Sequence, residues 1–213
     1  MKHIVNPRGL QRLALTMCAA ALLSGVLTAC VPLLLGGAVG GGALIATDRR
    51  TSGTQLEDEG IELRALSRLR SALGERNHVN LTSYNRQVLL TGEAANEQDK
   101  QQIQQTVAGV ENVSTIVNEL AIMGNSTLTQ RSSDALVTGR VKATLVDARD
   151  LSANAFKVVT ERGTTYLMGR VTQREADRGT EVARSTPGVQ KVVRMFEIIS
   201  EQELARLLPA AKR

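Results

Sequence analysis

The sequence between residues 61 and 199 contains two copies of one unit. The segment Val88-Leu-Leu-Thr-Gly92 corresponds to Thr165-Tyr-Leu-Met-Gly169 at an offset of 77 residues. Further along, Asn112-Val-Ser-Thr-Ile-Val117 corresponds to Gly188-Val-Gln-Lys-Val-Val193 at an offset of 76. A repeat of this kind means that one small fold is built twice. We therefore expect one domain over residues 61–122, a linker over 123–130 and a second domain over 131–199.

Each copy has the pattern of a helix, two strands, a second helix and a last strand. In the first copy, leucines recur at helical spacing, and the strand segments then alternate apolar with polar residues. Asn85-Arg86 and Arg162-Gly163 are expected to form tight hairpin turns, and Gly163 permits a positive φ. The leucines with helical spacing are Leu63, Leu66, Leu69 and Leu73, and the alternating apolar positions are Val79, Leu81, Val88 and Leu90.

The second helix of each copy is marked by its first residues. Asn96 is a helix cap in the first copy, and Thr172 with Glu175 forms a capping box in the second. The last strands are expected over 113–122 and 189–199. A strand–helix–strand crossover pairs its strands in parallel, whereas a hairpin pairs them antiparallel. The prediction is an α+β fold of two αββαβ domains, each with a three-stranded mixed sheet and two helices on one face. Ser200 with Glu203 predicts a short terminal helix that is ended by Pro209. This helix lies within a tail over residues 200–213.

The first 29 residues have the pattern of a secretory signal peptide. Lys2, Arg8 and Arg12 precede an apolar run that ends before Leu27-Thr28-Ala29-Cys30. That tetrapeptide resembles the lipobox of bacterial lipoproteins. The resemblance implies cleavage before Cys30, a diacylglycerol on its thiol and an N-acyl chain, and the absence of Asp after the cysteine implies the outer membrane. The alternatives are an ordinary signal peptide with a chance cysteine, or an uncleaved membrane helix.

A tether is expected between Cys30 and the first domain, over residues 30–60. Residues 31–46 carry no charge and include two glycine clusters, and this stretch is short for a membrane-spanning helix. We interpret it as an apolar segment close to the lipid surface, with a flexible linker free of the membrane as the alternative. Residues 47–60 are polar and mark the approach to the folded region.

The composition of the mature chain excludes several classes of function. After residue 29, His78 and Cys30 are the only histidine and cysteine. This leaves too few ligands for a metal site built on His and Cys, and no disulfide framework. Aromatic residues make up 2% of the chain, so base-stacking platforms for nucleic acid are missing. No nucleophile elbow or phosphate-binding loop is present. We expect no catalytic residue, metal, cofactor, nucleic acid or small-molecule substrate.

The repeated motifs resemble the BON domain. The resemblance is carried by Leu89-Leu-Thr-Gly-Glu-Ala and Leu167-Met-Gly-Arg-Val, each followed by a helix and a valine-rich strand. Two such domains behind a lipobox, with Asp48-Arg-Arg-Thr-Ser-Gly-Thr-Gln-Leu before them, are similar to the dual-BON-domain outer-membrane lipoproteins. The resemblance covers residues 47–199. It implies a non-enzymatic, periplasm-facing protein that binds anionic phospholipid, supports envelope integrity and accumulates at division sites.

Charge and patterning indicate the second copy as the lipid-binding one. Residues 61–122 hold six basic and seven acidic residues, whereas residues 131–199 hold twelve and eight. The helix expected over 134–149 has Val137, Val141, Leu145 and Ala148 on its core side. A helix that is apolar on its other side as well must cover that side too. That second side and its cations supply the expected phospholipid-binding residues, which are Leu136, Gly139, Arg140, Lys142, Ala143 and Val146.

Two other interpretations of this second face remain open. The face could pack against the first copy, or it could be alanine-rich and merely exposed. In the resembled family the first helix of the second domain contacts phospholipid, and Leu136 stands where a Trp is expected. A separate possibility for the protein is an adaptor that docks on envelope-assembly or division proteins.

The remaining histidine, acidic, tyrosine and methionine residues of note are expected to be solvated, capping or packing residues. His78 is interpreted as a solvated or capping residue and Glu57-Asp58-Glu59 as a solvated charge run. Tyr84, Tyr166, Met168 and Met195 are interpreted as packing residues.

Overall fold

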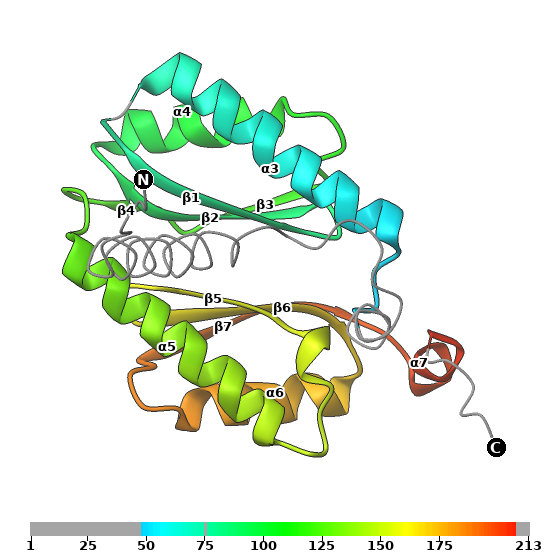
Figure 1. Ribbon diagram of the computed structural model, residues 1–213. Coiled ribbons are helices and arrows are strands. Elements are labelled where there is room, and N and C mark those ends of the chain that lie inside the picture. The colour runs from blue at the N-terminus through cyan, green and yellow to red at the C-terminus, as the bar shows by residue number, and fades with distance from the viewer. Residues whose placement is uncertain (1–47, 75, 208–213) are drawn as a thin grey trace, which may run out of the picture. The chain divides into compact units, whose positions relative to one another are not determined.

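The computed structural model describes residues 48–74 and 76–207 (Figure 1). The first repeat consists of helix α3 (Ser52–Leu73), strands β1 (His78–Tyr84) and β2 (Gln87–Ala94), helix α4 (Glu97–Ala108), and short strands β3 (Thr115–Asn118) and β4 (Ala121–Ile122). The second consists of helix α5 (Leu128–Asp147), a 3-10 turn η1 (Ala153–Ala155), strands β5 (Lys157–Glu161) and β6 (Thr164–Val171), helix α6 (Gln173–Ser185) and strand β7 (Lys191–Ile198). Helix α7 (Glu201–Leu207) follows.

Both repeats have the predicted strand topology. The middle strand of each, β2 or β6, pairs antiparallel with the strand before it and parallel with the strand after the crossover helix. The two helices of a repeat lie on the same face of its sheet (Figure 1). Asn85, Arg86, Arg162 and Gly163 all have positive φ, as two-residue hairpin turns require. The predicted α+β fold of tandem αββαβ units is confirmed.

The glycine of each repeated motif lies where another chain segment comes close. A Cβ on Gly92 would overlap the His78 carbonyl, and Gly92 also has φ +106°. A Cβ on Gly169 would overlap the Ala155 carbonyl. The motif glycine is therefore needed because backbone crosses it at van der Waals distance.

Each repeat has its own apolar core between helices and sheet. In the first, Ile61, Ala65, Leu69 and Leu73 of α3 pack on the strands and on α4. Leu63 belongs to the predicted stripe but is 70% exposed, because the buried stripe starts at Ile61 and runs along a neighbouring line of the helix. In the second, Val137, Val141 and Leu145 of α5 are buried as expected, with Ala148 partly buried beside them.

A third core joins the two sheets on the faces that the helices leave free. It contains Leu89 from the first repeat and Tyr166, Met168 and Met195 from the second, with Tyr84 at its edge. The Tyr84 hydroxyl accepts a hydrogen bond from the Arg170 amide at 3.2 Å. The expected packing roles of these tyrosines and methionines are confirmed. All three cores are formed by residues 61–199, so a fragment over 47–213 retains every core contact.

Both first helices begin earlier than the sequence pattern suggested. Helix α3 starts at Ser52 rather than near residue 61, with Thr51 capping it through the Thr54 amide. Helix α5 starts at Leu128, where Thr127 and Gln130 form a capping box. The polar residues at these helix starts do not disrupt the helix, because capped first turns tolerate polar side chains on their exposed sides.

Asp58 differs from the expectation of a solvated charge run. It is 2% exposed and accepts hydrogen bonds from Ser83 Oγ and from the amides of Asn85 and Arg86. Asp134 binds the second hairpin in the same way, through the amides of Arg162 and Gly163. An aspartate on the first helix therefore fixes the hairpin turn in each repeat.

The last strand of the first repeat is interrupted. The sequence predicts one strand over 113–122, but the structure has β3 and β4 separated by Glu119 and Leu120. The Asn118 side chain accepts a hydrogen bond from the Leu120 amide at 3.2 Å, so this amide is not available for strand pairing. Leu120 itself is buried in the first core.

The signal peptide, Cys30, the apolar tether and Pro209 lie outside the described residues. Among the residues that are described, no helix is both long and apolar enough to span a bilayer.

Candidate functional site

The outer face of α5 is open along its length. Leu136 is 63% exposed and Val146 is 67% exposed, and a Cβ added to Gly139 would have no neighbour within 4 Å. Every residue predicted for phospholipid contact is exposed: Leu136, Gly139, Arg140, Lys142, Ala143 and Val146. The alternative in which this face packs against the first repeat is therefore wrong.

Packing of the inner face of α5 in the core fixes the orientation of its outer face. Val137, Val141 and Leu145 are at most 5% exposed and fix the rotation of the helix on its sheet. The Thr127–Gln130 capping box fixes its first turn. Because the inner side of the helix is packed in the core, its apolar outer side is held facing away from that core.

A hollow of about 420 Å³ adjoins the C-terminal half of this face. Lys142 and Val146 of α5 form one side of it, and Phe156 and Lys157 contribute from the start of β5. Arg50, from the segment before α3, also lines the hollow. The remaining lining residues are Asp48, Tyr84, Ala153 and Asn154. Three cationic side chains and one carboxylate therefore border a partly apolar cavity.

The cations of the hollow differ in how far they are neutralised. Arg50 binds Asp48 at 2.7 Å and Asp58 at 2.8 Å, and its guanidinium lies 4.2 Å from the centre of the Tyr84 ring. Burial alone would lower the pKa of Arg50, but its hydrogen bonds to both aspartates raise it, so the group is permanently charged. Lys157 Nζ donates to the Ser83 carbonyl and to Glu62, both at 3.0 Å.

Lys142 is the available cation of the hollow. It is exposed, and it makes no ion pair with any residue in 48–74 or 76–207. The hollow thus has one cation free to bind an anion beside two that are already paired.

Arg50 and Lys157 were not predicted as site residues from the sequence. Arg50 belongs to the Asp48-Arg-Arg segment, which carried part of the family resemblance but no chemical argument. Its neighbour Arg49 donates to both carboxylate oxygens of Glu175 in the second repeat. The segment therefore runs along the second repeat before α3 begins, and nothing in a linear pattern places it beside Lys157.

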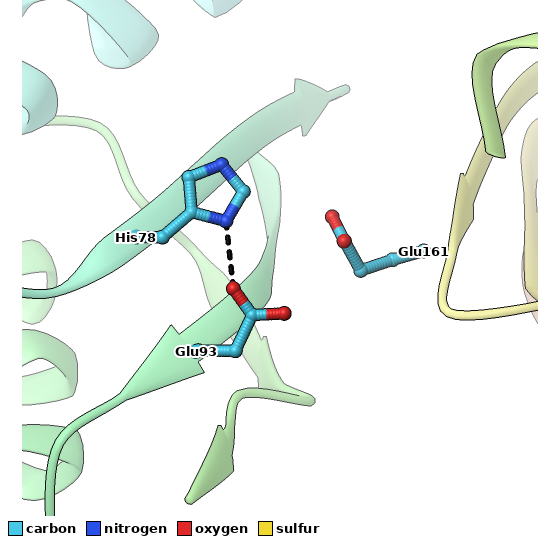
Figure 2. Close-up of side chains that lie close together, drawn as sticks. All are labelled: His78, Glu93 and Glu161. Atoms are coloured by element: carbon cyan, nitrogen blue, oxygen red, sulfur yellow. Dashed lines mark hydrogen bonds and ion pairs between the residues drawn. The ribbon is translucent and has the colours of Figure 1, made fainter. Parts of the chain in front are cut away.

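A second group of polar side chains lies where the repeats meet. His78 Nδ1 is 2.9 Å from Glu93 Oε2, and Asn80 donates to Glu161 of the second repeat at 2.8 Å. Figure 2 shows Glu161 directed toward His78 and Glu93 from the opposite repeat. His78 is half-buried and paired with a carboxylate, so it is not simply a solvated residue.

Comparison with known proteins supports the repeat assignment. The model of the BON domain family matches twice, over residues 58–124 and 133–200. Outer membrane lipoprotein DolP of Haemophilus influenzae is 35% identical over 193 residues, which cover 89% of this chain and 97% of that protein. The chain belongs to the dual-BON-domain outer-membrane lipoproteins. As a dual-BON lipoprotein, it is located at the outer membrane.

Two further proteins resemble the dual-BON lipoprotein less completely. A protein named 21 kDa hemolysin, from Actinobacillus pleuropneumoniae, is 33% identical over 154 residues, or 71% of this chain and 79% of that one. Among solved structures, CdsD of the type III secretion system of Chlamydia trachomatis matches 67% of this chain and 96% of its own, with 14% identity and a TM-score of 0.29.

Proposed function

We propose that this lipoprotein binds anionic phospholipid through the outer face of α5, while acyl chains on Cys30 anchor it to the outer membrane. The observation that carries the proposal is the exposed apolar side of α5, bordered by Arg140, Lys142 and Arg149. A rigid helix with exposed leucine and valine between basic residues is suited to lie in a lipid interface.

The length and charge of the face match a shallow interfacial contact. Leu136 and Val146 are ten residues apart, so they are separated by about 15 Å along the helix axis. Full burial of a leucine or valine side chain contributes roughly 1.5–3 kcal/mol, and each nearby cation about 1 kcal/mol on an anionic surface. The sum gives reversible binding, which becomes useful because the acyl chains already hold the protein at the membrane.

The hollow beside α5 supplies a place for a headgroup phosphate. When Val146 enters the acyl boundary, Lys142 stands at headgroup level, and the cavity bordered by Lys157 and Arg50 opens next to it. Asp48 in the same lining disfavours a second negative charge, so the hollow suits one phosphate group at a time.

The two attachments have separate roles in this proposal. The acyl chains give residence in the outer membrane, and α5 gives selectivity for regions rich in anionic lipid. Concentration of the protein in such regions would direct it to division sites and would account for a non-enzymatic role in envelope integrity. The BON-domain family membership and the DolP relative support the outer-membrane part of this proposal.

Vesicle co-sedimentation of the fragment 47–213 tests the proposal. We expect binding to phosphatidylglycerol or cardiolipin vesicles at low salt, weaker binding at 0.5 M NaCl, and little binding to phosphatidylcholine. Leu136→Asp and Lys142→Glu should each weaken binding about tenfold or more. Leu63→Asp is the matched control, because Leu63 is equally exposed on α3 of the other repeat. Equal loss in all three variants, or none, would refute the assignment.

Docking on a protein is the second candidate function. Leu56 and Leu63 are 71% and 70% exposed and lie seven residues apart on one side of α3. In vivo photo-crosslinking from position 63 that captures one stoichiometric protein, together with unaltered vesicle binding by Leu136→Asp, would favour the adaptor over the lipid-binding protein.

A further inference from the structure

Three potential metal ligands meet at the junction of the two repeats. His78 begins β1, Glu93 is the penultimate residue of β2, and Glu161 ends β5 of the second repeat. One ligand atom from each lies within 4.8 Å of the other two. The strands therefore bring one imidazole and two carboxylates to a single point from two domains (Figure 2).

One carboxylate oxygen of Glu93 is buried and accepts no hydrogen bond from any described residue. The side chain is fully buried, and its Oε2 is close to His78 and accepts hydrogen bonds from the Ser126 amide and hydroxyl at 3.0 and 3.1 Å. Its Oε1 is buried without any hydrogen-bond partner. The nearest cation, Arg162 Nη1, is 3.7 Å away. In Figure 2 this free oxygen points toward the Glu161 carboxylate.

Two buried carboxylates that face each other repel, and a positive charge between them would stabilise both. Glu93 is fully buried and Glu161 is 7% exposed, so water screens the repulsion between them only weakly. A bound cation would offset the repulsion and would satisfy Oε1 of Glu93.

We propose that His78, Glu93 and Glu161 form a binding site for one divalent transition-metal ion, of which Zn²⁺ fits best, and that the ion ties the two repeats together. Imidazole with carboxylate is a ligand set for Zn²⁺ rather than for Mg²⁺ or Ca²⁺, which prefer oxygen alone. Three protein ligands leave the fourth position of a tetrahedral site for water.

The geometry needs only small adjustments to accept the ion. Ligands at about 2.0–2.1 Å from a tetrahedral Zn²⁺ are roughly 3.3 Å apart, and the three ligand atoms lie within 4.8 Å of one another, so no pair must close by more than about 1.5 Å. Glu161 ends β5 at the hairpin, so the proposal requires only that its side chain rotate toward Glu93. Arg162 is 40% exposed and competes with the ion for Glu93, and it can turn toward solvent when the ion binds.

Composition led us to expect no metal site, and the cluster at the junction of the repeats is the reason to propose one. That expectation rested on histidine and cysteine only, and one histidine alone cannot hold an ion. It did not consider that Glu93 and Glu161, in different repeats, complete the ligand set. The competing explanation is a proton shared between the two carboxylates, which would also remove their repulsion but would give no metal binding.

The fragment 47–213 is well suited to test the site because it contains no cysteine and His78 is its only histidine. We expect calorimetric titration with ZnCl₂ at pH 7.5 to show one saturable site, with a rise in thermal unfolding temperature and a shift of the single imidazole ¹H signal. MgCl₂ at the same concentration should leave that signal in place. Absence of saturable Zn²⁺ binding would overturn the proposal and favour the shared proton.

Substitutions locate the ion and separate this proposal from lipid binding. Glu161→Gln retains an acceptor for Asn80 and should lower Zn²⁺ affinity at least about tenfold, as should His78→Gln. Glu197→Gln is the control, since Glu197 also bonds across the repeats, to Asn85, but lies outside the cluster. Arg162→Asn suits the positive φ of 53° and should tighten binding by removing the competing cation. Unchanged affinity in Glu161→Gln would overturn the site, whatever the result of the vesicle assay.

Discussion

Arg49 and Glu175 form a two-point ion pair between the segment before the first repeat and the first turn of α6 in the second. Both hydrogen bonds are 2.7 Å long, and each side chain is 4% exposed. Arg49 also donates to the Arg170 carbonyl, and Arg170 returns a bond to the Arg49 carbonyl. The segment that leads from the proposed membrane anchor is thus fixed to the repeat that carries the proposed lipid-binding face.

Breaking this pair from one side should destabilise the fold strongly. Arg49→Met leaves a buried carboxylate without its partner, and we expect a loss of about 3 kcal/mol in the free energy of urea unfolding. Glu175→Gln keeps the side chain that caps α6 but removes its charge. The double variant should lose less than the sum of the single losses. Additive losses would show that the pair contributes no coupling.

The hydrogen bonds from the first hairpin to Asp58 predict that the first repeat loses stability at acidic pH. Burial would raise the pKa of Asp58, but hydrogen bonds from Arg86, Ser83, Arg50 and Asn85 outweigh this and lower it from its usual 3.8. A lowered folded-state pKa gives stability that is fully present well above pH 4 and is lost as the pH falls through the folded-state value.

Asp58→Asn should therefore be less stable than the wild type at pH 7, by about 2 kcal/mol, and the difference should shrink as the pH approaches 3. Urea unfolding at several pH values measures this. Glu59→Gln is the control, because Glu59 is exposed on the same helix and should leave the profile unchanged. A difference that stays constant with pH would mean that the charge of Asp58 is not involved.

Replacing Gly92 or Gly139 by alanine should change the stability of the protein in opposite directions. Gly92→Ala places a Cβ against the His78 carbonyl and in a left-handed conformation, so we expect a loss of several kcal/mol or failure to fold. Gly139→Ala adds a Cβ to open space inside α5 and should raise stability by up to about 1 kcal/mol. Thermal unfolding of both variants tests the two positions. Similar behaviour of the two would contradict the close approach at Gly92.

The repeat made much of the fold predictable. Two copies of the same strand–turn–strand pattern gave the hairpins at Asn85-Arg86 and Arg162-Gly163, and caps such as Thr172 gave the helix starts. The capping box of Thr127 and Gln130 was also present in the sequence, but the start of α5 was missed because apolar periodicity begins later. Asp58 was missed because a charged run is usually solvated, and only the fold shows that the hairpin amides converge on it.

The candidate site was predictable where one helix carries it. Leu136, Lys142 and Val146 share a face at helical spacing, so the sequence could place them together. Arg50 and Lys157 are more than a hundred residues apart, and the cluster of His78 with Glu161 spans two repeats. Such neighbours depend on packing between elements, which no local pattern encodes.

A single tryptophan at position 136 tests the central claim most directly, since the chain has none of its own. In the fragment 47–213, Leu136→Trp should shift its fluorescence emission to shorter wavelength on phosphatidylglycerol vesicles and be quenched by lipids brominated near the headgroup, because the ring enters the interface. Leu63→Trp, on the equally exposed side of α3, should keep the emission of a water-exposed indole. Emission from position 136 that is unchanged by vesicles binding the fragment, or a shift at position 63 instead, would contradict the account.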